Sequence, residues 1–263
     1  MNATPMTDPS AVPAPSDRRI IAVASGKGGV GKTWLAITLA QTLARQGRRT
    51  LLFDGDLGLA NVDIQLGLMP DTDLQAVFTG QKALTDVILK HDETGFDIIA
   101  GRSGAGGLAR LPIERLDALG ERLVNLAPAY DHVLIDLGAG IETTVRRLVR
   151  PAGTVLVVTN EEPTSLTDAY AFIKLTVLDQ PRADIRIVVN MVPSTAAGEH
   201  AYRTLVRACE NFLKFTPKLA GIVRRDPRVP DCIRHQTPLL ARFPNCEAAE
   251  DVAAIVQGLT DPP

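Results

Sequence analysis

The sequence is poor in the residues that build several common kinds of site. Its 263 residues include three cysteines, four histidines and one tryptophan, and aromatic residues make up only 4%. The cysteines, at positions 209, 232 and 246, are odd in number and far apart, which argues against a disulfide framework. No histidine stands at metal-ligand spacing from a cysteine or a second histidine, which argues against a structural zinc site. The scarcity of aromatics argues against a stacking platform for single-stranded nucleic acid.

Long apolar runs and an excess of charge are also missing. No run of about 18 apolar residues is present, and the N-terminus lacks the charged-then-apolar pattern of a signal peptide. The chain carries 28 Lys and Arg against 30 Asp and Glu, a net charge of −2. This balance argues against a protein that binds nucleic acid over its whole surface. Binding through a local basic patch is still an alternative. We therefore expect a cytoplasmic protein, with peripheral contact at the inner membrane left open.

The chain divides into a short leader and one domain. Residues 1–18 are rich in Pro and Ala and are predicted to be a disordered leader, because proline removes backbone donors and favours extended chain. No linker interrupts the rest, so residues 19–263 are predicted to form a single domain.

Within this domain, short apolar runs alternate with segments of helical spacing. The runs predicted as strands are 20–24, 50–53, 96–100, 132–135, 154–159, 184–189 and 219–223. The predicted helices are 33–44, 74–78, 112–126, 141–149, 165–178, 199–213 and 247–256. This alternation is typical of an α/β fold with a doubly wound, mostly parallel sheet and helices on both faces. Ligands of such sheets bind at the carboxyl ends of the strands.

A glycine-rich motif follows the first predicted strand. It matches G-x-x-x-x-G-K-[ST] and consists of Gly26, Lys27, Gly28, Gly29, Val30, Gly31, Lys32 and Thr33. The glycines bring backbone amides close to phosphate, and these amides form an anion nest with the start of the following helix. Lys32 is expected to bind the β- and γ-phosphates, and the Thr33 hydroxyl is expected to bind Mg²⁺. We therefore predict that all eight residues bind a nucleoside triphosphate.

Carboxylates follow two further predicted strands. Asp56 comes just after the second strand and is expected to orient an attacking water. Asp136 follows the apolar run 132–135 and is expected to hold Mg²⁺ through water. Asp54 and Asp63 are interpreted as structural caps or turn formers.

Several of these segments resemble MinD/ParA-type ATPases. The stretch KGGVGKT, residues 27–33, resembles their deviant Walker A signature, and residues 54–63 and 136–141 resemble their two switch segments. The stretch EPTSLTDAYAFIK, residues 162–174, resembles the FleN/FlhG branch, whose members regulate flagellar number and placement. The resemblance extends over about residues 19–257.

This resemblance implies a P-loop NTPase with ATP and Mg²⁺ as cofactors. It implies slow ATP hydrolysis, stimulated by a partner, with Lys27, Lys32 and Asp56 as the catalytic residues. It also implies an ATP-dependent homodimer in which Lys27 reaches the neighbour's nucleotide. The further residues that the resemblance assigns are Asn190 and Asp226 at the base, and Asn61, Glu162 and Asp168 at the dimer contact. The expected partners are a signal-recognition-type flagellar GTPase, a transcription activator, or both.

The sequence departs from this family at two places. Arg224 and Arg225 stand where relatives usually have a proline and a variable residue, which puts the base pocket in doubt. Residues 245–263 contain no Lys or Arg, so a basic, membrane-binding amphipathic helix is not supported there, although membrane contact by another route stays open.

Two alternative functions stay open at this point. One is a ParA-type partition ATPase that binds DNA without sequence preference, with candidate arginines at positions 146, 147, 150, 224, 225, 228 and 234. The other is a regulatory scaffold that binds nucleotide without significant turnover. An electron-transfer relative of nitrogenase reductase is disfavoured, because no cysteine lies near the switch segments.

Overall fold

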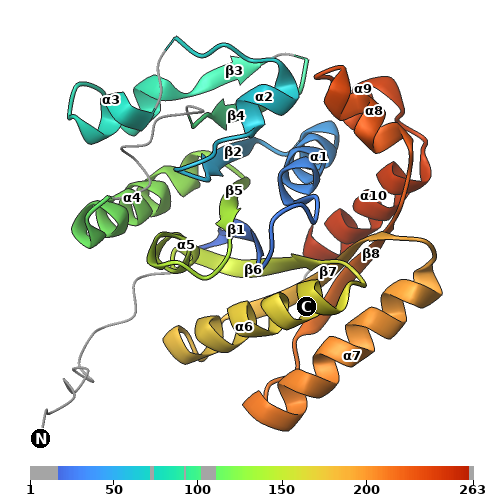
Figure 1. The fold of residues 1–263 in the computed structure, drawn as a ribbon. Helices are drawn as coiled ribbons and strands as arrows, with labels where there is room; N and C mark the ends of the chain where they lie inside the picture. Colours follow the sequence, from blue (N-terminus) through green and yellow to red (C-terminus); the bar gives the residue numbers. More distant parts are fainter. Residues whose placement is uncertain (1–16, 72–73, 92, 102–110, 261–263) are drawn as a thin grey trace, which may run out of the picture.

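An eight-stranded sheet forms the centre of the molecule in the computed structural model, which describes residues 17–71, 74–91, 93–101 and 111–260 (Figure 1). The strands lie in the order β3-β4-β2-β5-β1-β6-β7-β8. Every neighbouring pair is parallel except β3 and β4, which are antiparallel. The strands are β1 (Asp17–Ser25), β2 (Thr50–Gly55), β3 (Leu89–His91), β4 (Phe96–Ile99), β5 (His132–Ala139), β6 (Ala152–Thr159), β7 (Asp184–Val192) and β8 (Lys218–Arg224).

Helices cover both faces of this sheet. One face is covered by α4 (Ile113–Leu126), α5 (Thr143–Val149), α6 (Pro163–Asp179) and α7 (Thr195–Leu213) (Figure 1). The other face is covered by α1 (Lys32–Arg45) and α10 (Glu247–Thr260), with the shorter α2 (Val62–Leu66), α8 (Arg228–Arg234) and α9 (Leu239–Arg242) beside them. The remaining elements are α3 (Leu74–Phe78) and the 3-10 helices η1 (Leu84–Val87) and η3 (Ala127–Ala129).

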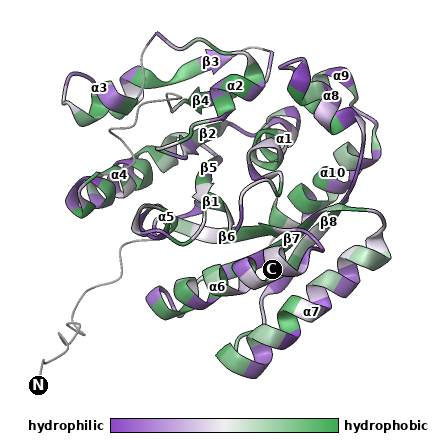
Figure 2. Cartoon of the chain, viewed as in Figure 1, coloured by the Kyte–Doolittle hydropathy of each residue, from purple (hydrophilic) through white to green (hydrophobic). Residues whose placement is uncertain are grey.

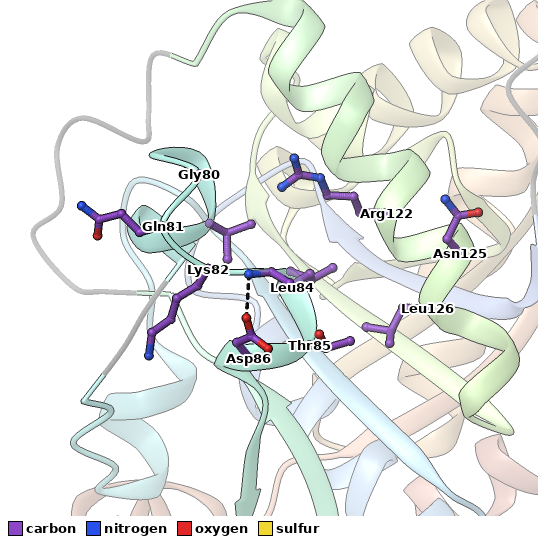
Figure 3. A pocket seen from close by; sticks show the side chains of 11 residues that line it. Gly80, Gln81, Lys82, Leu84, Thr85, Asp86, Arg122, Asn125 and Leu126 are labelled. Atoms are coloured by element: carbon purple, nitrogen blue, oxygen red, sulfur yellow. Dashed lines mark hydrogen bonds between the residues drawn. The ribbon is translucent and has the colours of Figure 1, made fainter.

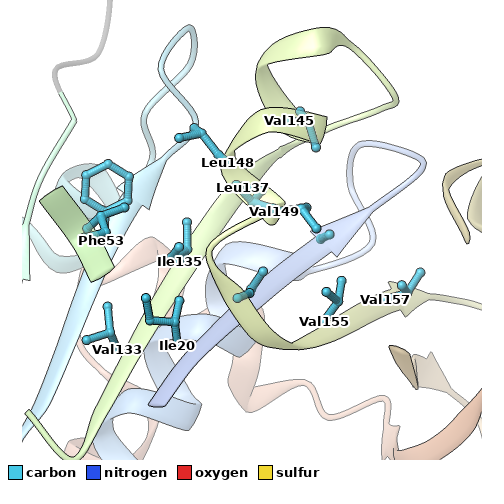
Figure 4. Packing of buried hydrophobic residues seen from close by; sticks show 14 of the residues in the cluster. Ile20, Phe53, Val133, Ile135, Leu137, Val145, Leu148, Val149, Val155 and Val157 are labelled. Carbon is cyan, nitrogen blue, oxygen red and sulfur yellow. The ribbon is translucent and has the colours of Figure 1, made fainter. Parts of the chain in front are cut away.

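Side chains alternate between two cores along each central strand. In β1, Ile20 and Ala22 belong to the core beneath α4–α7, whereas Ile21 and Val23 belong to the core beneath α1 and α10. Figure 4 shows the first core, where side chains of β2, β5 and β6 meet those of α5. The outer helices carry both apolar and polar residues along their length, as expected for helices that bury one side (Figure 2). The central strands are thus buried on both faces, which fixes their register and the position of the loops at their ends.

The predicted fold class is confirmed, and each strand and helix predicted from the sequence overlaps one in the structure. The expected leader is longer than the structure allows, because its last two residues, Asp17 and Arg18, belong to β1. Residues 1–16 lie outside the described residues. The short elements β3, α2, α8 and α9 were not predicted, because their few residues show no clear hydrophobic period.

The two edges of the sheet differ from its centre. One edge strand, β3, has only three residues and runs antiparallel to its neighbour. The other, β8, begins with Lys218 and ends with Arg224. Among the helices in the described part of the chain, none combines the length and the apolar character needed to cross a membrane.

Candidate nucleotide site

The glycine-rich motif forms a loop between the carboxyl end of β1 and the start of α1. Gly31 caps α1 with φ 83°, a left-handed conformation that favours glycine. A Cβ at Gly31 would also lie 2.4 Å from Nδ2 of Asn190, so a side chain does not fit there. At Gly31 the loop therefore follows a path that only glycine can take, and the first amides of α1 are left to face an anion.

Lys32 and Asp136 form a buried ion pair beneath this loop. Lys32 Nζ donates to Asp136 Oδ1 at 3.0 Å, and the two side chains are 8% and 0% exposed. Burial raises the pKa of Asp136, while the neighbouring Lys32 and Thr33 oppose this shift. The predicted phosphate-binding lysine and the predicted magnesium-binding aspartate thus lie together, as the sequence motif requires.

The other oxygen of Asp136 fits a metal-bound water. Oδ2 is buried and has no hydrogen-bond partner among the described residues. A buried acceptor without a partner is costly, so this atom is poised for a ligand, and the Thr33 hydroxyl lies beside the same carboxylate. The described residues hold no group of three or more His, Cys, Asp or Glu arranged for a metal. Mg²⁺ would therefore be held by Thr33, by Asp136 through water and by the oxygens of the nucleotide, as Mg²⁺ commonly is.

Asp54 is a buried carboxylate that holds the first switch segment, residues 54–63. It is fully buried and lies opposite Asp136 in the register of β2 and β5. Its carboxylate accepts hydrogen bonds from the backbone amides of Asp56, Asn61 and Val62, each at 3.1 Å, which agrees with the expected structural role. Burial, and next the Asp136 charge, raises the pKa of Asp54, while the three amide hydrogen bonds oppose this shift. The sequence signal for this role is an aspartate at the end of an apolar strand, followed by a glycine-containing turn that it can cap.

Asp56 belongs to the first switch segment, residues 54–63, and faces the second. Its Oδ1 accepts a hydrogen bond from the amide of Leu59 at 3.0 Å, and its charge raises the pKa of Asp136. A Cβ on Gly138 would lie 3.4 Å from this oxygen, so the second switch segment passes directly beside Asp56. The Asp56 carboxylate therefore lies near Asp136, and its expected role in orienting water stays a prediction.

Lys27 lies at the front of the loop and contacts α6 of its own chain. Its Nζ donates to Glu162 Oε2 at 2.8 Å and to Thr164 Oγ1 at 2.9 Å. The lysine side chain is 37% exposed and the Glu162 side chain 58%, and the hydrogen bond from Lys27 lowers the pKa of Glu162. Two of the four predicted dimer contacts are thus paired with each other within the chain. Their role between chains stays a prediction.

The other two predicted dimer contacts also lie at the carboxyl ends of the strands. Asn61 precedes α2, and its backbone amide is held by Asp54. Asp168 lies on α6, and its backbone carbonyl would be 2.1 Å from a Cβ on Gly26. The start of the phosphate loop therefore lies directly against the backbone of α6.

Asn190 holds the phosphate loop, and Asp226 holds the chain that follows β8. Asn190 is buried, donates from Nδ2 to the Val30 carbonyl at 2.8 Å and accepts at Oδ1 from the amide of Met191. Asp226 is also buried and accepts from the amide of Arg228 at 2.9 Å. Asn190 thus supports the loop directly, whereas Asp226 caps the segment before α8. The predicted contacts with the base are not tested by this arrangement.

The candidate DNA-binding arginines are largely balanced by carboxylates. Arg224 clamps Asp251, with Nη2–Oδ1 at 2.9 Å, and also reaches Glu247, which directs it to α10 and away from the phosphate loop. The other pairs are Arg146–Asp179, Arg147–Asp117, Arg228–Asp226 and Arg234–Asp231. The positive charge of these runs is therefore partly neutralised in place.

A cavity of about 550 Å³ lies between the segment 80–86 and α4 (Figure 3). Arg122 and Asn125 reach toward it from α4, and Asp86 accepts a hydrogen bond from the amide of Ala83 at its floor. No residue of the glycine-rich loop lines this cavity, so it is separate from the nucleotide site.

Comparison with known proteins identifies the group of sequences to which this site corresponds. Residues 21–239 match the CobQ/CobB/MinD/ParA nucleotide binding domain. The chain is 36% identical to the antiactivator FleN of Pseudomonas aeruginosa over 239 residues, which are 91% of this chain and 85% of that protein. It is 31% identical to the flagellum site-determining protein YlxH of Helicobacter pylori over 194 residues, 73% of this chain and 65% of that protein.

Solved structures agree with this sequence match. The cell division ATPase MinD of Pyrococcus furiosus superposes with a TM-score of 0.78 at 25% identity, covering 92% of this chain and 98% of that one. The septum site-determining protein MinD of Pyrococcus horikoshii, complexed with Mg-ADP, superposes with a TM-score of 0.77 at 24% identity, covering 92% and 96%. The second likeness concerns the fold alone.

Proposed function

Because the chain belongs to the CobQ/CobB/MinD/ParA family of nucleotide-binding domains, within its MinD/ParA group and FleN branch, we propose that it is an ATP-dependent dimerisation switch that regulates flagellar number and placement. As a member of this group it is a MinD-like ATPase. The observation that carries the proposal is the phosphate loop with two lysines, one buried against Asp136 and one exposed at the front.

The chain's own residues supply most of the chemistry of hydrolysis. The loop amides from Gly26 to Thr33 and the Lys32 ammonium would bind the triphosphate, and Asp56 would orient the attacking water. Thr33 and Asp136 would hold Mg²⁺, whose charge, when bound, neutralises charge on the phosphates. Asp54 holds the loop that carries Asp56 in place through three backbone hydrogen bonds.

The exposed lysine supports the dimerisation step. Lys27 and Glu162 form an exposed pair, and such pairs contribute little stability in water. Lys27 can therefore exchange Glu162 for the more highly charged phosphates of a neighbouring nucleotide without a large penalty. Its position at the carboxyl edge of the sheet, where the nucleotide of a facing copy would lie, favours this exchange.

Replacing Lys27 tests the dimerisation step. We expect the Lys27→Ala variant to bind ATP as the unchanged protein does and to stay monomeric with ATP, because Lys32 still binds the chain's own phosphates. The measurement is size-exclusion chromatography with light scattering, run with ATP and with ADP. Lys174→Ala, which removes an exposed lysine elsewhere on α6, is the matched control and should dimerise with ATP. A Lys27→Ala protein that dimerises normally with ATP would contradict the switch.

The flagellar output is supported by the two relatives named above, one an antiactivator and one a flagellum site-determining protein. We propose a transcription activator, a signal-recognition-type GTPase, or both, as the partners through which the switch acts. We expect deletion of the gene to change the number or position of flagella, counted by electron microscopy. The original gene should restore them and a Lys32→Ala version should not, and an unchanged flagellar pattern in the deletion strain would refute the flagellar role.

A further inference from the structure

A second cluster of positive charge lies at the end of the sheet opposite the nucleotide site. A cavity of about 430 Å³ is lined there by Arg19, Arg48, Arg49 and His132, and we name it the arginine pocket. Arg19 lies near the start of β1, Arg48 and Arg49 directly precede β2, and His132 begins β5. These three strands are neighbours in the sheet, so the pocket lies at the amino ends of the central strands.

The acidic groups at the pocket only partly balance its arginines. Arg19 is paired with Asp17 at 3.0 Å, whereas Arg49 reaches Asp131 only at 3.8 Å. The Asp131 carboxylate already accepts a hydrogen bond from the Arg49 backbone amide at 2.8 Å. Arg48 has no carboxylate partner among the described residues. The pocket therefore keeps a net positive charge and an uncommitted guanidinium.

His132 adds a polar atom without a partner. Its Nδ1 is buried and makes no hydrogen bond within the described part of the chain. Burial lowers the pKa of His132, and the Arg48 charge lowers it further, while Asp131 opposes the shift. The positive charge of Arg48 thus acts directly on the imidazole, and an anion bound between them would relieve that repulsion.

The shape and charge of the pocket favour one ligand chemistry. Guanidinium groups bind oxyanions through paired hydrogen bonds, and Arg48, with the loosely paired Arg49, offers more donors than the two oxygens of a carboxylate can use. A phosphate group offers more oxygens and more charge. We propose that the arginine pocket binds a phosphate group, carried either by a free anion or by a lipid headgroup. The pocket lies at the amino ends of the strands, away from the nucleotide site, so this binding does not depend on the proposed switch.

Titration of the full chain with inorganic phosphate tests this proposal. Saturating Mg-ADP keeps the glycine-rich loop filled, and NMR follows the four histidines, with His132 assigned by a His132→Gln variant. We expect phosphate, compared with chloride at equal ionic strength, to raise the pKa of His132 and to leave the other three unchanged. Arg48→Ala should weaken binding about tenfold, the effect of losing one charge-assisted hydrogen bond. Arg203→Ala, an exposed arginine on α7, is the matched control and should bind normally.

Vesicles distinguish the two sources of the phosphate. Sedimentation with phosphatidylglycerol vesicles that depends on Arg48 would assign the pocket to a lipid headgroup, with phosphatidylcholine as the neutral control. A shift of His132 by inorganic phosphate without vesicle binding would assign it to a free anion. The proposal is overturned if neither probe binds, if Arg48→Ala binds like the unchanged protein, or if all four histidines shift alike.

Discussion

Lys32→Ala is expected to weaken ATP binding by roughly 100-fold or more. The lysine supplies the buried positive charge of the loop, and losing a charged hydrogen bond in such a place costs about 1.5–3 kcal/mol, with the lost Coulomb attraction added. The measurement is direct nucleotide binding by calorimetry, with Lys90→Ala as the control for removal of an exposed lysine. ATP binding by a folded Lys32→Ala protein at the original affinity would refute the assignment.

The same substitution should also destabilise the chain, and this second effect must be separated from the first. Lys32 is the ion-pair partner of the fully buried Asp136, and removing one partner of a buried pair leaves an uncompensated charge. The double variant Lys32→Ala/Asp136→Asn removes both partners, so we expect its thermal stability to recover. Its ATP binding should stay weak. Recovery of both properties together would mean that Lys32 acts only through folding.

Gly26→Ala is expected to disturb the loop through its contact with α6. A Cβ at this position would lie 2.1 Å from the carbonyl oxygen of Asp168 and 2.7 Å from the nitrogen of Ala169. Both are helix backbone atoms that cannot rotate away, so either the loop or α6 must move. Overpacking of this kind costs about 1–3 kcal/mol, and for a chain of this size each kcal/mol lowers Tm by roughly 2–4 °C. ATP binding should fall as well, because the amides that cradle the phosphates are displaced.

Gly28→Ala is the matched control for this prediction. A Cβ on Gly28 meets nothing within 4 Å, although the residue belongs to the same loop. We therefore expect Gly28→Ala to keep the Tm of the unchanged protein when both are melted without nucleotide. Equal melting temperatures for Gly26→Ala and Gly28→Ala would show that the contact with α6 does not constrain the loop.

The parts of the site that the sequence predicts are those that depend on residues adjacent in the chain. Gly26 to Thr33 carry their own chemistry in one stretch, and apolar runs followed by Asp56 and Asp136 indicate the carboxyl ends of buried strands. The pairing of Asp54 with Asp136 depends on β2 lying next to β5, which no local pattern encodes.

Ion pairs between residues far apart in the sequence are the contacts that the sequence interpretation did not predict. Lys27 meets Glu162 across 135 residues, so the sequence predicted each as a dimer contact but not their ion pair within one chain. The arginine runs resembled basic patches for the same reason, because carboxylates such as Asp179 and Asp251 lie far along the chain from them. Charge read along a chain thus overestimates the charge that the folded surface presents.

The two edge strands of the sheet, β3 and β8, affect whether copies of this protein can aggregate by pairing their strands. An exposed edge strand can pair with a strand of another chain. Natural proteins prevent this with edge strands that are short or carry charged side chains. Here β3 has only three residues, and β8 begins with the exposed cation Lys218. Both edge strands therefore disfavour polymerisation by strand addition. This leaves nucleotide binding, in the proposed switch, to control self-association.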